Sequence, residues 1–330
     1  MLETIIGALL PIVITMLLGY LAAKHHDFGP QEASILIRMV MTYALPVALF
    51  VGTVSRTRGA LLQDLPLLIV LTVAIVGLYV VVLLVCRGAL RLSLGRSALA
   101  ALAASAPNVG FVGPTVLGSL YGAASGLPVA LGNLVIVLTV VPLTVILLSL
   151  DANACASVSA SPLAPPIAPS SSPGVASRAA VAGKIVAALK QPIVWLPLLG
   201  VILVLSGRSL PTLLIDALTL LGQSASGVAL FAAGIILAVH HVRVTGRAAA
   251  LAFIKNIAEP GLVWVSLYVL GYRNPLLGEA VVTTALPVLV TVAMLAVQYQ
   301  VAEAEAASTL FIGMGSSLLT VAGFIALTGA

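Results

Sequence analysis

The residues best suited to chemistry form a break inside an apolar segment. Pro107, Asn108, Gly110 and Gly113 fall within the stretch SAPNVGFVGP, near the middle of a segment long enough to cross a bilayer. In hydrocarbon each unpaired N–H or C=O costs several kcal/mol, so a break there needs partners for the freed backbone. The half-helix after the break begins with free N–H groups and about half a positive charge. The chemistry that these residues predict is anion binding.

A second break lies at the corresponding depth of a later segment. Pro287 and Val288 mark it, and Thr291 follows on the same helix face. Two such breaks would bring two half-helix N-termini to one point; the alternative is that each proline only kinks a packed helix. Asn133 either reaches the first break or bonds a neighbouring helix. The predicted substrate-binding residues are Pro107, Asn108, Gly110, Gly113, Asn133, Pro287, Val288 and Thr291.

One pair of opposite charges lies within an apolar segment. Lys255 and Glu259 are spaced i,i+4, with Glu259 near mid-depth. A charge there costs roughly 2.5–3.5 kcal/mol on insertion scales and indicates a function by default. Two roles are open: a mutually neutralising structural pair, or a proton-linked switch. The sequence shows no nucleophile–base constellation, phosphate loop, metal set or cofactor motif, so we expect no enzyme, no metal and no cofactor.

The composition predicts an integral membrane protein. Of 330 residues, 61% are hydrophobic and 8% charged, and the mean hydropathy is +1.22. A soluble domain carries roughly 25% charged residues, so this chain cannot cover a water-facing surface. The net charge of +5 is scattered over short loops, which argues against a nucleic-acid partner. The expected surroundings are a lipid bilayer.

The apolar segments predict an all-α fold of ten transmembrane helices. They are separated by short polar joints and one Ala/Ser/Pro-rich stretch. The predicted spans are 4–23, 31–54, 65–87, 97–120, 126–150, 184–206, 211–239, 248–270, 276–299 and 306–327. The sequence therefore divides into a first five-helix repeat (1–150), a disordered cytoplasmic linker (151–183) and a second five-helix repeat (184–330).

Landmarks in the two halves indicate an internal repeat. Pro11 and Pro192 are 181 residues apart, the two Val-Ala-Leu-Phe stretches at 47–50 and 228–231 are 181 apart, and Pro107 and Pro287 are 180 apart. Because each half has an odd number of spans, the second repeat would be inverted. Inverted repeats are typical of secondary transporters, whose site lies where the halves meet. The alternative is a chance alignment of prolines.

Specific motifs resemble the auxin efflux carrier family, including its bacterial members. They lie in predicted spans 2, 4, 6, 7 and 9, and the resemblance covers nearly the whole chain apart from the linker. The matching stretches are YALPVALF (43–50), NVGFVGP (108–114) with Tyr121-Gly122, QPIVWLPLLG (191–200), VALFAAG (228–234), and Pro287 with LAVQY (295–299) and Ala307-Ser308.

The resemblance implies two inverted five-helix repeats in which spans 4 and 9 cross at the substrate and spans 1, 2, 6 and 7 form a scaffold. It implies a secondary transporter of a small organic anion, malonate or a similar dicarboxylate, by alternating access. A passive anion channel, or a carrier of another small carboxylate or an auxin-like acid, is the alternative. Gly227 and Thr291 depart from the family pattern. No acidic residue stands beside Pro287, so the sequence does not support sodium coupling. Protons, through Lys255 and Glu259, are a candidate coupling partner; the coupling ion and a homodimer are both left open.

The basic residues of the joints predict the orientation. One side holds nine Lys and Arg residues and the other four, and the richer side should be cytoplasmic. Both termini would then lie outside a plasma membrane, the bacterial inner membrane. A cysteine at Ser161 should resist an impermeant thiol reagent in intact cells, whereas one at Gly271 should react. The reverse labelling pattern would overturn this orientation.

Overall fold

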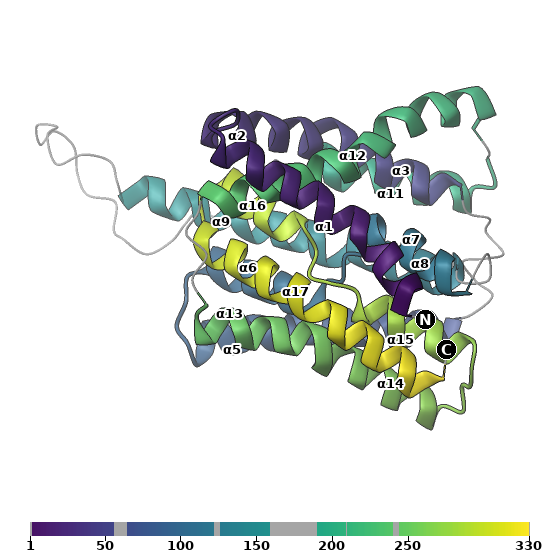
Figure 1. The fold of residues 1–330 in the computed structure, drawn as a ribbon. Helices are drawn as coiled ribbons and strands as arrows, with labels where there is room; N and C mark the ends of the chain where they lie inside the picture. Colours follow the sequence, from purple (N-terminus) through teal and green to yellow (C-terminus); the bar gives the residue numbers. More distant parts are fainter. Residues whose placement is uncertain are drawn as a thin grey trace, which may run out of the picture.

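The computed structural model describes residues 2–55, 65–121, 126–158, 190–208, 210–239 and 244–329. Apart from one isolated β-bridge, the regular structure of these residues is entirely helical (Figure 1). Six helices are long and apolar enough to cross a membrane: Pro30–Val54, Leu65–Gly88, Pro128–Asp151, Thr212–Val239, Gly246–Val269 and Glu303–Thr328. The helical ranges fall where the sequence predicts helices, and the chain has the character of a membrane protein.

The elements follow one another in a simple order. In the first half they are α1 (Leu2–Lys24), α2 (Pro30–Met39), η1 (Val40–Ala44), α3 (Leu45–Val54), α5 (Leu65–Gly88), α6 (Leu94–Ser105), α7 (Val109–Tyr121), α8 (Gly126–Val135), η3 (Ile136–Val140) and α9 (Val141–Val158). In the second half they are α11 (Pro192–Leu205), α12 (Thr212–Val239), α13 (Gly246–Phe253), η4 (Ile254–Ala258), α14 (Glu259–Val269), α15 (Leu276–Ala285), α16 (Thr291–Tyr299) and α17 (Glu303–Thr328).

Local sequence signals explain several helix ends. The side chain of Ser93 accepts a hydrogen bond from the amide of Arg96 at the start of α6, and Thr245 does the same for Ala248 at the start of α13. Such caps satisfy N–H groups that have no partner within the helix. Three π-helical turns, η1, η3 and η4, interrupt otherwise continuous helices. Turns of this kind often occur at functional sites.

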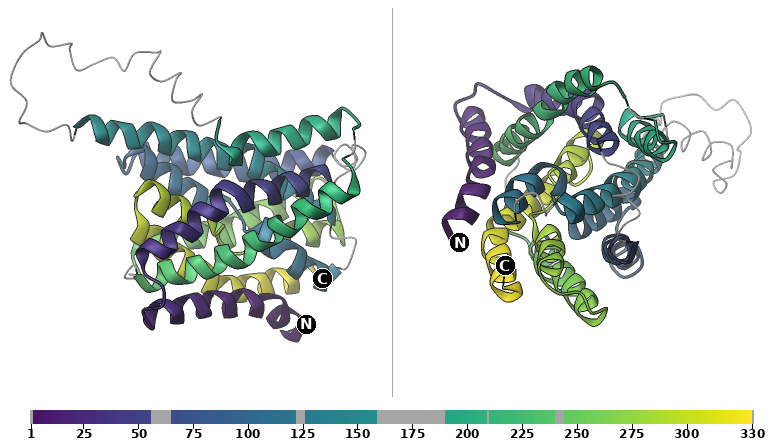
Figure 2. Two further views of the ribbon diagram at one scale, coloured as in Figure 1. Left: turned by 90° about the horizontal axis from the view of Figure 1, so that it is seen from above. Right: turned by 90° about the vertical axis from the view of Figure 1, so that its right-hand side faces the viewer.

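The helices form two groups. The scaffold group contains α1, α2, η1, α3, α11 and α12, in which α1 packs on α12 and α11 packs on α3. The crossing group contains the remaining helices, including α6, α7, α15 and α16. The first residue of α1 and the last residue of α17 lie at the same end of the molecule (Figures 1 and 2). The two groups place the site described below between them.

Glycines bring α1 and α12 into close contact. A side chain on Gly234 would overlap the carbonyl of Met16, and one on Gly19 would overlap the carbonyl of Phe231. Small residues let the backbones of membrane helices approach, which compensates for the absence of a hydrophobic force between helices in lipid. The scaffold group therefore depends on these two glycines.

The expected start of the linker at residue 151 is wrong. Helix α9 continues through Val158, so residues 151–158 are helical. The stretch DANACASV contains three alanines and neither proline nor glycine, and so it favours continuation of the helix over a linker. The prolines that break helices first occur at 162, and residues 159–189 lie outside the described part of the chain.

Substitution of Gly234 should destabilise the protein, and Gly227 of the same helix provides a matched control. A Cβ at Gly227 would meet no atom within 4 Å. We expect Gly234→Ala to lower the free energy of unfolding by roughly 1–3 kcal/mol through overpacking, and Gly227→Ala to be neutral or stabilising. Thermal denaturation of the two variants in the same detergent measures the difference. Equal melting temperatures would contradict the close packing of α1 and α12.

Candidate substrate site

The two broken helices are joined to each other at their breaks. Helix α6 ends at Ser105 and α7 begins at Val109, while α15 ends at Ala285 and α16 begins at Thr291. Across the gap, the amide of Asn108 donates to the carbonyl of Pro287 at 2.8 Å, and the amide of Leu289 donates to the carbonyl of Ala106 at 3.0 Å. Each break therefore satisfies backbone groups that the other break has freed.

The geometry of this pairing explains why prolines are tolerated. Pro107 lies opposite Val288 in an isolated antiparallel bridge, and the two hydrogen bonds are made by the flanking residues. In such a non-hydrogen-bonded pair, neither of the opposing residues donates to the other. Pro107 therefore loses nothing by lacking an N–H, and Pro287 contributes only its carbonyl. The prolines interrupt the helices without leaving the crossing unpaired.

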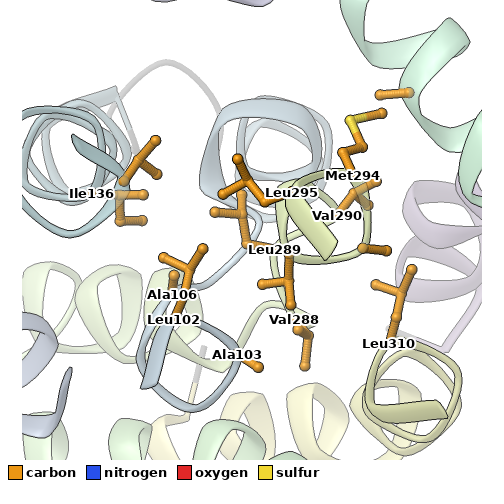
Figure 3. Packing of buried hydrophobic residues seen from close by; sticks show 14 of the residues in the cluster. Leu102, Ala103, Ala106, Ile136, Val288, Leu289, Val290, Met294, Leu295 and Leu310 are labelled. Carbon is orange, nitrogen blue, oxygen red and sulfur yellow. The ribbon is translucent and has the colours of Figure 1, made fainter. Parts of the chain in front are cut away.

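Apolar side chains surround the crossing and exclude water from its backbone hydrogen bonds. Figure 3 shows Leu102, Ala103 and Ala106 beside Val288 and Leu289. All five are at most 6% exposed. On another side α17 approaches closely, because a side chain on Gly313 would overlap that of Val288. The crossing is thus a packed element that both halves of the chain build.

A cavity of about 390 Å³ lies between the crossing and the scaffold group. Its scaffold wall comes from α3 and α12, and its other wall comes from α7, α8, η3 and the start of α16. Its volume is within the range of roughly 300–1,000 Å³ that is usual for small-molecule sites. Most of its lining is apolar, and its polar contributors are Thr53, Asn133, Thr219, Gln223, Ser226 and Thr291.

The cavity offers neutral hydrogen-bonding groups and helix starts to a ligand. Among the described residues, none that lines it is charged. Gly110, in the first turn of α7, and Thr291, the first residue of α16, both line its wall. The first amides of a helix have no acceptor within the helix and carry the positive end of its dipole. An anion in this cavity would be held by backbone N–H groups, amides and hydroxyls.

Comparison with known proteins identifies the family. Residues 4–325 match the family described as "Membrane transport protein". The chain belongs to this family. It is 32% identical over 262 residues to "Uncharacterized transporter YfdV" of Escherichia coli strain K12, which covers 79% of this chain and 77% of that protein. It is also 25% identical over 329 residues to "Putative malonate transporter" of Rhizobium meliloti strain 1021, which covers 97% and 95%.

Membership of the family confirms the resemblance that the motifs indicated. The protein is a transport protein and not an enzyme. Its several apolar helices make it a multi-pass membrane protein. Its family indicates that the substrate is a small molecule.

The residues predicted for substrate binding divide into three sets. Gly110, Asn133 and Thr291 line the cavity. Pro107, Pro287 and Val288 build the crossing and do not line the cavity. Gly113 and Asn108 also lie outside the lining.

Gly113 is a packing residue. A Cβ at this position would lie 3.2 Å from a methyl group of Val109 and 3.3 Å from one of Val129, so its small size lets α7 approach α8. Asn108 is 0% exposed, and neither atom of its side-chain amide has a hydrogen-bond partner in the described part of the protein. A buried amide in this condition costs free energy unless a partner arrives.

Sequence reasoning missed the polar face of α12. Thr219, Gln223 and Ser226 are spaced four and three residues apart and contribute together to the cavity. This i, i+4, i+7 spacing of polar residues on one face of an apolar helix was a signal that could have found them.

Lys255 and Glu259 do not line the cavity. Both side chains are 0% exposed, and Nζ of Lys255 lies 2.9 Å from Oε2 of Glu259. The pair is behind the second break, where Nζ also donates hydrogen bonds to the backbone carbonyls of Thr284 and Leu286.

Gly110 provides the sharpest test of the cavity. A Cβ added there would lie 2.9 Å from Oδ1 of Asn133, whereas a Cβ at Gly118 of the same helix would meet nothing within 4 Å. We expect Gly110→Leu to reduce substrate affinity by about tenfold or more, because the side chain would fill the approach to the backbone donors and displace Asn133. Gly118→Leu should retain wild-type affinity. Binding of labelled malonate to both purified proteins measures this, and equal affinity would contradict the assignment.

Proposed function

We propose that the protein is a secondary transporter that carries a small organic anion, malonate or a similar dicarboxylate, across the bacterial plasma membrane by alternating access. The observation that carries this proposal is the cavity of about 390 Å³ between the scaffold group and the crossing. A site between two groups of helices can open to one side and then to the other when one group moves against the other.

The helix pairing supports an inverted repeat. In the predicted numbering of spans, α1 is the first and α12 the seventh, while α11 is the sixth and α3 belongs to the second. Contacts of α1 with α12 and of α11 with α3 are the exchange that two repeats related by a two-fold axis would make. The crossing has the same character, because each break donates one amide and supplies one carbonyl.

The substrate class follows from chemistry and from a relative. The helix starts at Gly110 and Thr291, with the amides of Asn133 and Gln223, favour carboxylate oxygens. The relative of Rhizobium meliloti carries the name of a malonate transporter. Another small carboxylate or an auxin-like acid would use the same donors, and the mostly apolar lining would accept its hydrocarbon part.

A passive channel for anions is the competing function. It would need a continuous polar path through the membrane, whereas the residues packed at the crossing, such as Leu102, Ala106 and Leu289, are apolar and at most 6% exposed. We therefore favour a carrier. We further propose that both termini face outward, that the linker is cytoplasmic, and that protons are the coupling ion.

Counterflow in proteoliposomes distinguishes the two functions. Vesicles containing the purified protein are loaded with unlabelled malonate and diluted into labelled malonate. A carrier predicts transient accumulation of label above its external concentration, saturable with substrate and absent from protein-free vesicles. A channel predicts equilibration without overshoot. If malonate fails, acetate, succinate and indole-3-acetate test the other carboxylates, and absence of counterflow with all of them would overturn the proposal.

A further inference from the structure

One buried cation supports the crossing from behind. Lys255 lies on the π-helical turn η4, and Glu259 begins α14. The Nζ of Lys255 donates hydrogen bonds to the carbonyl oxygens of Thr284 at 2.6 Å and Leu286 at 3.1 Å, and lies 2.9 Å from Oε2 of Glu259. The two carbonyls take two of the three donors of the ammonium group, and the contact with Glu259 is an ion pair.

The two carbonyls belong to the end of the first half of a broken helix. Helix α15 ends at Ala285, and Leu286 is its C-cap, directly before Pro287. The last four carbonyls of a helix have no partner within it and carry about half a negative charge. In a dry interior such carbonyls need donors from elsewhere, and a cation is the favoured partner.

We propose that Lys255 is a positioning residue whose ammonium group caps the carbonyl end of α15, in the place that a bound cation could take. It holds the end of α15, and through Leu286 it holds the extended segment from Pro287 to Leu289 against the first break. Glu259 balances the buried charge. Two carbonyl oxygens and one carboxylate oxygen would form a set of three ligands for a small free cation if the lysine were shortened.

In the described part of the first half, the positions that correspond to Lys255 and Glu259 carry no charge. Ile75 and Tyr79 stand 180 residues before Lys255 and Glu259, the same separation as Pro107 and Pro287. Both are uncharged, and the hydroxyl of Tyr79 is paired with that of Thr144 at 2.9 Å. The cation therefore makes the second break different from the first, so the lysine is no requirement of the repeat itself.

Three variants separate a helix cap from a simple ion pair. Lys255→Met removes the ammonium, Glu259→Gln keeps an oxygen acceptor, and the double variant removes both charges. The cap predicts that Lys255→Met and the double variant each lose about tenfold or more of malonate counterflow, because the carbonyls of Thr284 and Leu286 lose their donor in both. Glu259→Gln leaves the ammonium buried without its counterion and should also be impaired. A simple ion pair predicts equally impaired single variants and a double variant that recovers. Recovery of the double variant would overturn the proposal.

A second measurement does not depend on the transport activity on which the first rests. Lys255→Ala lacks the volume and charge of propylammonium. Added propylammonium chloride should raise the melting temperature of purified Lys255→Ala by about 5 °C, while leaving wild type unchanged. The uncharged molecule 1-propanol, at equal concentration, should not raise it.

Equal effects of both compounds, or no effect of either, would overturn the cation site. A failure of counterflow alone would count against the proposed function instead. If Lys255→Ala does not fold, a melting temperature of the double variant equal to that of wild type would overturn the cation site.

Discussion

Two backbone hydrogen bonds between the broken helices constrain the rest of this structure. A membrane interior offers no water to satisfy free N–H and C=O groups, so two interrupted helices would each be costly alone. Here the amide of Asn108 binds the carbonyl of Pro287, and the amide of Leu289 binds the carbonyl of Ala106. Each half of the chain thus supplies what the other lacks. The two halves can fold into a stable crossing only together.

Several other features follow from this crossing. Because the helices restart at Val109 and Thr291, their positive ends lie at the wall of the cavity, where none of the described lining residues is charged. Gly313 lets α17 press on Val288, and Lys255 occupies the carbonyls at the end of α15. The scaffold group contacts itself through Gly19 and Gly234 and leaves the polar face of α12 to the cavity. The proposed alternating access would move the scaffold group against the crossing.

Much of this arrangement could be predicted from the sequence, because proline and glycine in an apolar segment leave few physical solutions. The positions of both breaks and the helix ranges followed from the lengths of the apolar segments and the backbone chemistry of proline and glycine. The mutual pairing of Asn108 with Pro287 did not, since no local pattern specifies which partner a free amide finds. Asn108 lies buried beside the cavity lining instead of within it, and Gly113 is a packing residue. The acceptors of the Lys255 ammonium were equally hidden, because a sequence shows its i+4 neighbour but not the carbonyls of a distant helix.

Amide hydrogen exchange, measured by mass spectrometry on the protein in lipid nanodiscs, tests whether one anion contacts the starts of both α7 and α16. If it does, malonate, or another carboxylate that shows counterflow, should slow exchange in peptides covering residues 109–113 and 290–294 together. Peptides from α14, on the far side of the second break, should exchange at unchanged rates. Protection of only one of the two helix starts, or protection confined to other helices, would contradict a shared anion site at the crossing.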